Sequence, residues 1–339
     1  MYRSPFDARR RRVLLHLGVS ATLPAMTALP AMPAWSAEKD SYPNRLIKLI
    51  VPFPPGGGND TLGRLVAQRL TGALGQQVIV DNHPGAGGNL GTELAARAAP
   101  DGYTLNLGFV ANMCMTPSMS KARYDPLKDF APVSLVAQGY QVLAVNPKVP
   151  VKSVDELVAL AKKEPHTLNY ASGGTGTPLH LVGELFKMVT QTDIQHVPYQ
   201  GSGRAALAVI AGEAEIVFGA VVSVLPFIQS GRLRPLAVTA PQRIPAVPDL
   251  PTLNELGYKG VEASSWYGLY VPAATPEPII QRLNAEVVKA EADPAFIAQL
   301  ERQGQQAMSS TPKELGDFTK AEYDKWSKVV KAAHITMES

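Results

Sequence analysis

Cysteine is almost missing from this sequence: Cys114 is the single one among 339 residues. One cysteine cannot form a disulfide within the chain, so the folded protein must be stabilised by its hydrophobic core. Cys114 lies in an apolar run, where a buried and unreactive thiol is expected. His83 and His196 show no ligand spacing with a cysteine or a carboxylate, so no metal site is predicted.

The short motifs of common exported enzymes are missing as well. The sequence contains no Gly-x-Ser-x-Gly elbow and no His-Glu-x-x-His helix. Residues 58–64 have the spacing of a phosphate loop but lack the Lys-Ser/Thr pair that nucleotide chemistry requires. A catalytic triad whose members meet only in the fold stays open, so an exported hydrolase is kept as the less favoured alternative. We predict a protein that is not an enzyme and that uses no cofactor.

Charged residues are few, 18% of the chain, and the positive excess is confined to the N-terminus. Residues 1–37 hold five arginines and one aspartate, so the rest of the chain carries a net charge of −1, against +3 for the whole. This balance gives no argument for nucleic-acid binding.

The N-terminal segment has the layout of a secretory signal peptide. Arginines at 9–12 precede an apolar stretch at 13–29, and small residues follow at 34–37. Pro24 interrupts the apolar stretch and Pro30 follows it, and the stretch is short for a membrane span, so an anchor is the less favoured alternative. Residues 10–14 also fit a loose twin-arginine pattern, and both export routes stay open. We predict that residues 1–37 are removed and that the protein is periplasmic.

Residues 46–63 contain the pattern on which the functional prediction rests. A β-branched apolar run at 47–51 predicts a strand, and the prolines and three consecutive glycines that follow predict a loop. Asn, Asp and Thr at 59–61 supply N-cap side chains ahead of an amphipathic helix. A helix start offers unpaired N–H groups with a partial positive charge, and glycines allow close approach. We therefore predict an anion site there, and a small carboxylate as the anion.

The same order of elements recurs in the middle of the chain. Glycine loops follow predicted strands around Gly56 and Gly85, and again around Gly174 and Gly201. Strands that alternate with helices are typical of a parallel sheet, whose ligand lies beyond the carboxyl ends of the strands. Two similar lobes are therefore predicted, each offering a helix N-terminus to one small anion. Strands are predicted at 47–51, 77–80, 103–109, 141–145, 168–171, 194–197, 215–218, 235–239 and 267–271, and the last helices at 277–291, 294–303 and 312–333.

Seven segments, in order along the chain, carry a resemblance to a known family. They are Pro-Phe-Pro-Pro-Gly-Gly (52–57), Asn-His-Pro-Gly-Ala-Gly-Gly (82–88), Pro-Asp-Gly-Tyr (100–103), Tyr-Ala-Ser-Gly-Gly-Thr-Gly (170–176), Val-Pro-Tyr-Gln-Gly (197–201), Gly-Arg-Leu-Arg-Pro-Leu-Ala-Val-Thr (231–239) and Trp-Tyr-Gly (266–268). Together they resemble the Bug-type extracytoplasmic receptors of tripartite tricarboxylate transporters. The resemblance covers nearly all of residues 43–330.

The resemblance implies an α/β, two-lobed periplasmic binding protein fold of the type II-like kind. Each lobe is expected to be a sheet flanked by helices, with the ligand cleft between the lobes. We expect lobe 1 to comprise residues 38–137 and 244–339, and lobe 2 to comprise 138–243. The family's first loop and second-lobe loop, here 53–59 and 172–177, are expected to hold carboxylates through backbone N–H groups, hydroxyls and ordered water.

Several candidates carry an alternative that the sequence leaves open. His180 is predicted to reach the ligand or to be a packing or surface histidine, and Tyr199 to enter the cleft or to pack its lobe. For Asn112, contact with the ligand and absence of such contact are equally favoured. Gly219 stands where many members have Asp, which favours a more apolar, even aromatic, acid over an amino acid. The predicted ligand-binding residues are Phe53, Pro54, Gly56, Gly57, Asn59, Asn112, Ser172, Gly173, Gly176, Thr177, His180, Tyr199 and Gly219.

The predicted function is that of a periplasmic solute-binding protein. It is expected to capture a di- or tricarboxylate or an aromatic acid as a monomer, and to close by a hinge motion. The expected partners are the ligand and the permease subunits of a tripartite tricarboxylate transporter, with no nucleic acid. A ligand sensor for a signalling partner has the same fold and site and stays an alternative.

Overall fold

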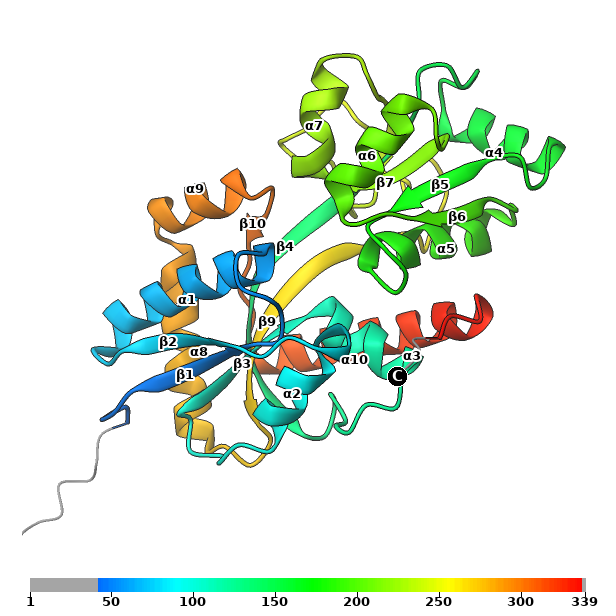
Figure 1. The fold of residues 1–339 in the computed structure, drawn as a ribbon. Helices are drawn as coiled ribbons and strands as arrows, with labels where there is room; N and C mark the ends of the chain where they lie inside the picture. Colours follow the sequence, from blue (N-terminus) through cyan, green and yellow to red (C-terminus); the bar gives the residue numbers. More distant parts are fainter. Residues whose placement is uncertain (1–41, 337–339) are drawn as a thin grey trace, which may run out of the picture. The chain divides into compact units, whose positions relative to one another are not determined.

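Two β-sheets share one long strand, β4 (Phe130–Val145), in the computed structural model, which describes residues 42–336. The predicted signal peptide, residues 1–37, lies outside this range. The first sheet has the strand order β2-β1-β3-β9-β4, with β10 added to β4; the second has the order β4-β7-β5-β6, with β8 added to β4. We call the parts of the chain built on these sheets lobe 1 and lobe 2. Figure 1 shows β4 and β9 paired where they run from one sheet toward the other.

Helices follow most strands in both lobes. The elements of lobe 1 before β4 are β1 (Ile47–Val51), α1 (Gly58–Leu74), β2 (Val78–Asn82), a 3₁₀ turn (Ala86–Gly88), α2 (Asn89–Ala96), β3 (Thr104–Phe109), a π-helical turn (Ala111–Met115) and α3 (Thr116–Met119). Lobe 2 contains α4 (Val154–Lys163), β5 (Asn169–Ser172), α5 (Pro178–Thr190), β6 (Gln195–Pro198), α6 (Ser202–Ala211), β7 (Ile216–Ala220), α7 (Val221–Gln229) and β8 (Arg234–Val238). The chain returns to lobe 1 with β9 (Ser264–Pro272), α8 (Glu277–Glu291), α9 (Pro294–Arg302), β10 (Gln306–Ala307) and α10 (Pro312–Ala332).

The strand registers turn the carboxyl ends of the parallel strands in each lobe toward the other lobe. Strand β3 ends at Phe109, opposite Tyr267 of β9, and Tyr267 in turn lies opposite Ala137 of β4. Strand β7 ends at Ala220, opposite Gln141 of β4. Because β3 runs parallel to β4 and β7 runs antiparallel to it, both sets of ends point into the same stretch of β4. Four residues of β4 separate the two levels, which is roughly 13 Å of strand.

Local sequence explains why the helices begin where they do. The Ser153 hydroxyl accepts the N–H of Glu156 and starts α4, as predicted. The Thr177 hydroxyl accepts the N–H of His180, and Pro178 occupies the first helical position of α5, again as predicted. The predicted side-chain cap of α1 is wrong: the helix begins at Gly58, and its N-cap residue is glycine.

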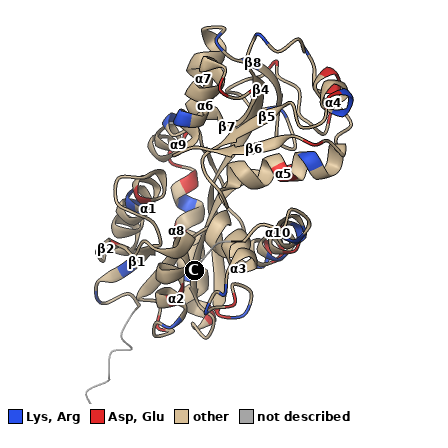
Figure 2. Cartoon of the chain, turned by 45° about the vertical axis from the view of Figure 1, so that its right-hand side comes forward, with Lys and Arg blue, Asp and Glu red and all other residues tan. Residues whose placement is uncertain are grey.

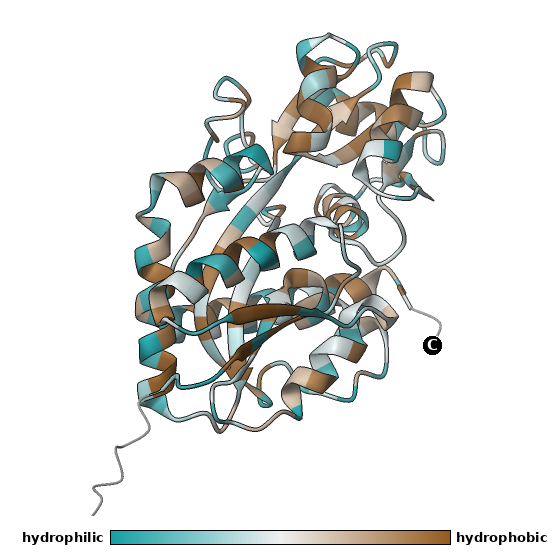
Figure 3. Ribbon diagram, turned by 60° about the vertical axis from the view of Figure 1, so that its left-hand side comes forward, coloured by the Kyte–Doolittle hydropathy of each residue, from teal (hydrophilic) through white to brown (hydrophobic). Residues whose placement is uncertain are grey.

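Apolar side chains fill both faces of the lobe 1 sheet. Leu49 and Val51 of β1 face one cluster, which α1 and α8 cover, and Ile50 faces the other. The second cluster continues into lobe 2, because Trp326 of α10 in lobe 1 and Phe186 of α5 in lobe 2 belong to the same core. Figure 3 shows the hydrophobic strands between helices of mixed character, and Figure 2 shows that charged residues lie mainly on helices and loops. Each fully buried large apolar side chain stabilises the fold by about 1.5–3 kcal/mol.

The predicted fold class is confirmed, and one long element was missed. The observed strands lie within about two residues of most predicted ones, but β4 begins at Phe130, eleven residues before its predicted start at 141. The predicted lobe limits stay a prediction, because β4 and β9 pass from one sheet toward the other. No helix within residues 42–336 combines the length and hydrophobicity needed to cross a membrane.

Candidate functional site

The loop between β1 and α1 presents unpaired backbone donors at the edge of lobe 1 that faces lobe 2. The N–H groups of Gly58, Asn59 and Asp60 have no acceptor among the described residues, whereas the N–H of Thr61 already donates to the carbonyl of Gly57. These are the first N–H groups of a helix of 17 residues, where the positive end of the helix dipole lies. An anion at this point would receive several hydrogen bonds from the backbone alone.

Asp60 shapes this loop instead of capping the helix. Its Oδ2 accepts the N–H of Gly56 at 2.9 Å and pairs with Arg64 at 3.0 Å. Burial opposes ionisation, but the Gly56 N–H and the Arg64 guanidinium outweigh it and lower the pKa of Asp60. The carboxylate is therefore charged and balanced by Arg64, so it does not cancel the attraction of the helix start for a ligand anion.

The loop between β5 and α5 uses most of its polar groups internally. The N–H of Gly174 donates to the Ser172 hydroxyl at 3.1 Å, and the N–H of Gly176 donates to His180 Nδ1 at 3.0 Å. The Thr177 hydroxyl donates to the carbonyl of Gly174 at 2.7 Å. Thr175 is exposed, and its N–H and hydroxyl have no partner among the described residues. Fewer N–H groups of this loop remain free than the resemblance implied.

His180 and His196 lie beneath this loop as a stacked pair. Their ring centroids are 3.8 Å apart and their planes are inclined by 14°. His196 Nε2 lies 2.6 Å from the Ser172 hydroxyl. Burial lowers the pKa of each ring to about 4, helped by Lys187 at His180 and by His180 at His196. His180 is thus a packing histidine that supports the loop, which was one of the two alternatives.

The Ser172–His196 contact resembles the nucleophile and base of a hydrolase. Ser172, however, has no exposed surface, and its oxygen already accepts the N–H of Gly174. A substrate carbonyl would have no access to this oxygen. The arrangement therefore gives no support to the hydrolase alternative.

Asn112 and Tyr199, two of the predicted ligand-binding residues, direct polar side-chain atoms to partners within the protein. Asn112 is fully buried; its Oδ1 accepts the N–H of Phe109 at 2.9 Å, and its Nδ2 donates to the Thr92 hydroxyl at 2.7 Å. The Tyr199 hydroxyl donates to Glu213 at 3.3 Å, beyond the far end of α6. Thr92 and Glu213 lie 20 and 14 residues away in the sequence, so these contacts became visible only in the fold. The half-buried ring of Tyr199 packs against the core of lobe 2, which favours the packing alternative, and its contact with a ligand stays a prediction.

Gly219 has no room for a side chain, so its expected meaning must be corrected. A Cβ atom there would lie 2.2 Å from Cγ1 of Val224 on α7. A carboxylate at this position would run into the helix rather than into the space between the lobes. The preference for an apolar ligand cannot be inferred from Gly219.

Three aromatic rings lie together where β1 and β3 end, at the sheet edge from which the loop to α1 starts, and sequence reasoning singled out only the first of them. Phe53 and Phe109 meet edge to face with ring centroids 5.7 Å apart, and Phe109 stacks on Tyr267 at 4.8 Å. Phe53 and Phe109 are half-buried, whereas Tyr267 is buried. Phe109 is the last residue of β3. Ligands bind beyond the carboxyl ends of parallel strands, so this position could have identified Phe109 as a candidate from the sequence.

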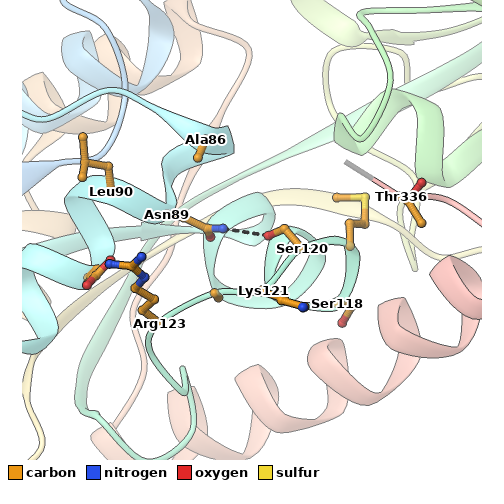
Figure 4. Close-up of a pocket in the computed structure, with 11 residues that line it drawn as sticks. Ala86, Asn89, Leu90, Ser118, Ser120, Lys121, Arg123 and Thr336 are labelled. Carbon is orange, nitrogen blue, oxygen red and sulfur yellow. Dashed lines mark hydrogen bonds between the residues drawn. The ribbon is translucent and has the colours of Figure 1, made fainter. Parts of the chain in front are cut away.

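The second glycine loop, residues 82–88, supports the first. A Cβ atom at Gly88 would lie 3.2 Å from the ring of Phe53 and 2.9 Å from Cβ of Asn112, so this close contact requires glycine. A cavity of about 750 Å³ lies beside this loop and is lined by α2, α3 and Thr336 (Figure 4). Leu90, more than half exposed, and the Asn89–Ser120 hydrogen bond of 2.8 Å border it. The lining contains no residue of the two loops that offer N–H groups.

The remaining predicted positions lie in the two loops. Gly56 to Gly58 are exposed, and Gly173 and Thr177 are half-buried. Residues 42–336 contain no group of three His, Cys, Asp or Glu side chains placed to hold a metal ion. Two lobes joined by β4 and β9, with N–H donors and aromatic rings where their strands end, define the class of two-lobed solute-binding proteins.

Comparison with known proteins identifies the family. Residues 62–335 match the tripartite tricarboxylate transporter family receptor, and the chain belongs to this family. Protein BugT of Bordetella pertussis is 37% identical over 297 residues, covering 86% of this chain and 90% of BugT. The solved structure of Rpa4515 of R. palustris with adipate is 33% identical, with a TM-score of 0.72, and covers 87% of this chain and 99% of its own. MatC of Rhodopseudomonas palustris with bound malate is 31% identical, with a TM-score of 0.69, and covers 85% of this chain and 100% of its own. The protein is a solute-binding receptor and not an enzyme.

Proposed function

We propose that this receptor binds a small carboxylate in the periplasm, between the first loop of lobe 1 and the 172–177 loop of lobe 2. The observation that carries the proposal is the run of free N–H groups at Gly58, Asn59 and Asp60. Hydrogen bonds to an ionised acceptor are about twice as strong as neutral ones, so no arginine fork is needed. Thr175 offers a hydroxyl and an N–H from the opposite lobe.

The rest of the ligand is proposed to be apolar. Phe53 and Phe109 offer half-buried rings at the sheet edge from which the loop to α1 starts, and a methylene chain or an aromatic ring would bury apolar area against them. The similar proteins with adipate and malate support a dicarboxylate as the class. An acid with two carboxylates and an apolar middle could use the N–H donors of both loops for its charges and the lobe 1 rings for its apolar part.

The physiological role is proposed to be delivery of this acid to permease subunits of a tripartite tricarboxylate transporter. Closure of the two lobes about β4 and β9 would create the state that these membrane partners recognise. Export through an N-terminal signal peptide, by either route, and a monomeric state belong to the same proposal.

One matched pair of variants tests the site in lobe 1. Gly58 is the first residue of α1 and has open space around it, and Gly57 before it has φ −83° and ψ 171°. Proline fits such a position, so Gly58→Pro removes one N–H group while the helix keeps its start. Gly58→Ala keeps the N–H group and is the control.

Binding is measured by calorimetry with adipate, malate and benzoate, after a thermal-shift screen of the mature protein. We expect Gly58→Pro to weaken binding of the best acid roughly ten- to hundred-fold, as the loss of a hydrogen bond to a charged group predicts. Gly58→Ala should stay within about threefold of the wild type. Equal affinities for both variants would show that the anion lies elsewhere, and shifts with amines or sugars only would reject the carboxylate.

A further inference from the structure

The stacked histidines and the two glycine N–H groups above them form one connected unit. His196 contacts the Ser172 hydroxyl at 2.6 Å, and that oxygen receives the N–H of Gly174. His180 Nδ1 receives the N–H of Gly176. His196 is thus linked to Gly174 through Ser172, and His180 binds Gly176 directly. The two rings stack with their centroids 3.8 Å apart.

The two held residues have backbone conformations that only glycine adopts readily. Gly174 has φ +128° and Gly176 has φ +75°. Glycine gains much freedom when it is released, so this loop needs anchors to keep one shape. With both N–H groups turned toward the protein interior, the exposed Thr175 between them keeps its own donors free.

The hydrogen bond of His180 sets the protonation of its ring. A nitrogen that accepts an N–H group must be unprotonated, so neutral His180 carries its proton on Nε2. Protonation of Nδ1 would turn an acceptor into a donor that faces the N–H of Gly176. It would also place a positive charge against the second ring of the stack.

The surroundings offer little compensation for a charged ring. Strand β5 contributes Tyr170, whose hydroxyl donates to Glu184 at 2.7 Å. Helix α5 contributes Glu184 itself and Lys187, which pair at 2.9 Å. Strand β6 contributes His196. Around Glu184 and Lys187, the C-terminal end of α10 adds only uncharged groups, Val329 and Ala332, followed by Ala333. The one nearby carboxylate is thus already engaged by a hydroxyl and an ammonium group.

We propose that His180 and His196, as a neutral stacked pair, are the positioning residues of the lobe 2 ligand loop, and that protonation of the pair releases this loop and weakens ligand binding. The effect of the histidines on ligand binding rests on the proposed function, whereas their effect on the loop conformation does not. Burial keeps the pKa of both rings near 4, so the pair is neutral at pH 7 and the loop stays anchored. Anchoring is lost as the pH falls through about 4.

Two substitutions at one position separate the accepting atom from the ring. In His180→Asn the amide oxygen can take the place of Nδ1, and it does not titrate near pH 4. In His180→Leu no acceptor remains. The first measurement is amide hydrogen exchange of Gly176 in the ligand-free protein at pH 7, together with the ¹⁵N shifts of the imidazole rings.

We expect the wild-type His180 to carry its proton on Nε2. We expect the exchange of Gly176 to be at least tenfold faster in His180→Leu than in the wild type, and near the wild-type rate in His180→Asn. Unchanged exchange in the leucine variant, or a proton on Nδ1 at pH 7, would overturn the proposal. If the leucine variant does not fold, the ring shifts and the asparagine variant still decide the question.

The second measurement is the affinity for adipate of wild type and His180→Asn between pH 8 and 4. Protonation of the ligand itself affects both proteins equally. The ratio of the two Kd values therefore measures how protonation of His180 changes binding through the loop. The ratio should be flat above pH 6, and the wild type should lose roughly two- to fourfold more affinity than the variant by pH 4, where about half of each ring is protonated. Parallel profiles would overturn the pH-dependent release. If adipate does not bind the wild type at pH 7.5, the proposed ligand class is wrong, while the exchange and tautomer results still test the positioning role.

Discussion

Gly219 and Val224 stand so close that no side chain fits between them: a Cβ atom on the glycine would lie 2.2 Å from Cγ1 of the valine. Strand β7 ends at Ala220 and α7 begins at the next residue, so the helix folds back directly onto the strand. Val224 is fully buried at this contact. The glycine is thus explained by packing and not by the chemistry of the ligand.

Replacement of Gly219 by aspartate should therefore destabilise the protein rather than create a site for an amino group. We expect a loss of roughly 2–4 kcal/mol in the free energy of unfolding, since a buried charge and an overlap are introduced together. Urea denaturation measures the loss. Gly219→Ala should cost less, and adding Val224→Ala should recover part of that cost because it makes room. A stable Gly219→Asp protein that binds aspartate would contradict this interpretation.

Much of the fold could be predicted because the residues that start its helices lie close together in the sequence. The starts of α4 and α5 are predicted from Ser153 and from Thr177 with Pro178. In the structure, each hydroxyl accepts the backbone N–H three residues later, as predicted. The first part of β4 was missed for an equally physical reason. Pro132 lies within it, and the register with β9 shifts at two points, so the strict alternation that signals a strand is broken.

The loops of the site could be predicted from their glycines, but the use of their donors could not. The N–H of Gly176 donates to a histidine that the helix places four residues later, and Asn112 pairs with Thr92 of another helix. The sequence leaves Tyr199 open between the cleft and the packing of its lobe, and it does not indicate that the hydroxyl donates to Glu213. Such pairings depend on how neighbouring elements pack, and a single sequence does not record that.

Glu322 should contribute strongly to stability, because it links α10 to strand β9. Its Oε2 accepts the indole N–H groups of Trp266 at 3.1 Å and Trp326 at 2.9 Å, and its other oxygen pairs with Lys325. Both indoles are fully buried. Glu322→Ala leaves two buried donors without a partner, and we expect it to cost about 3 kcal/mol of stability in chemical denaturation.

A control for this variant exists on the same helix. Asp317 pairs with Lys313, and both side chains are largely exposed. Asp317→Ala should therefore change the free energy of unfolding by about 0.5 kcal/mol or less. Equal losses for the two variants would mean that the indole contacts contribute nothing beyond helix charge.

Acid should destabilise the protein through the same two histidines that hold the lobe 2 loop. Burial lowers the pKa of His180 and His196 to about 4, whereas an unfolded histidine titrates near 6.5. Between these values the unfolded chain binds more protons, so stability is full above about pH 6.5 and falls as the pH drops toward 4. We expect a loss of roughly 2 kcal/mol from the pair, after allowance for solvent screening of the partly exposed rings.

The difference between wild type and a His180→Asn/His196→Asn double variant isolates this contribution. Denaturation curves at pH 7.5, 6, 5 and 4 should show the wild type falling more steeply than the variant, even if the variant is less stable at pH 7.5. Identical slopes would show that both rings protonate as easily in the folded as in the unfolded chain.

Phe53 and Phe109 should decide which carboxylates the receptor prefers. Their half-buried rings lie at the same edge of the lobe 1 sheet as the loop that leads to α1. We expect them to bury the apolar part of the acid, while the N–H groups bind its carboxylate. Replacing Phe109 by leucine removes ring contact while keeping apolar volume. An aromatic contact is worth about 0.5–1.5 kcal/mol beyond area burial, which corresponds to a loss of roughly two- to twelve-fold.

We therefore expect Phe109→Leu and Phe53→Leu to weaken adipate or benzoate by several-fold, and malate by less than about twofold, in calorimetric titrations. Phe227→Leu is the matched control, because Phe227 is also half-buried but packs under Arg232 near the end of α7. A uniform loss for all three acids would mean that the rings only support the loop. An unchanged preference would place the apolar part of the ligand against lobe 2, where Val222, nearly half exposed, lies at the start of α7.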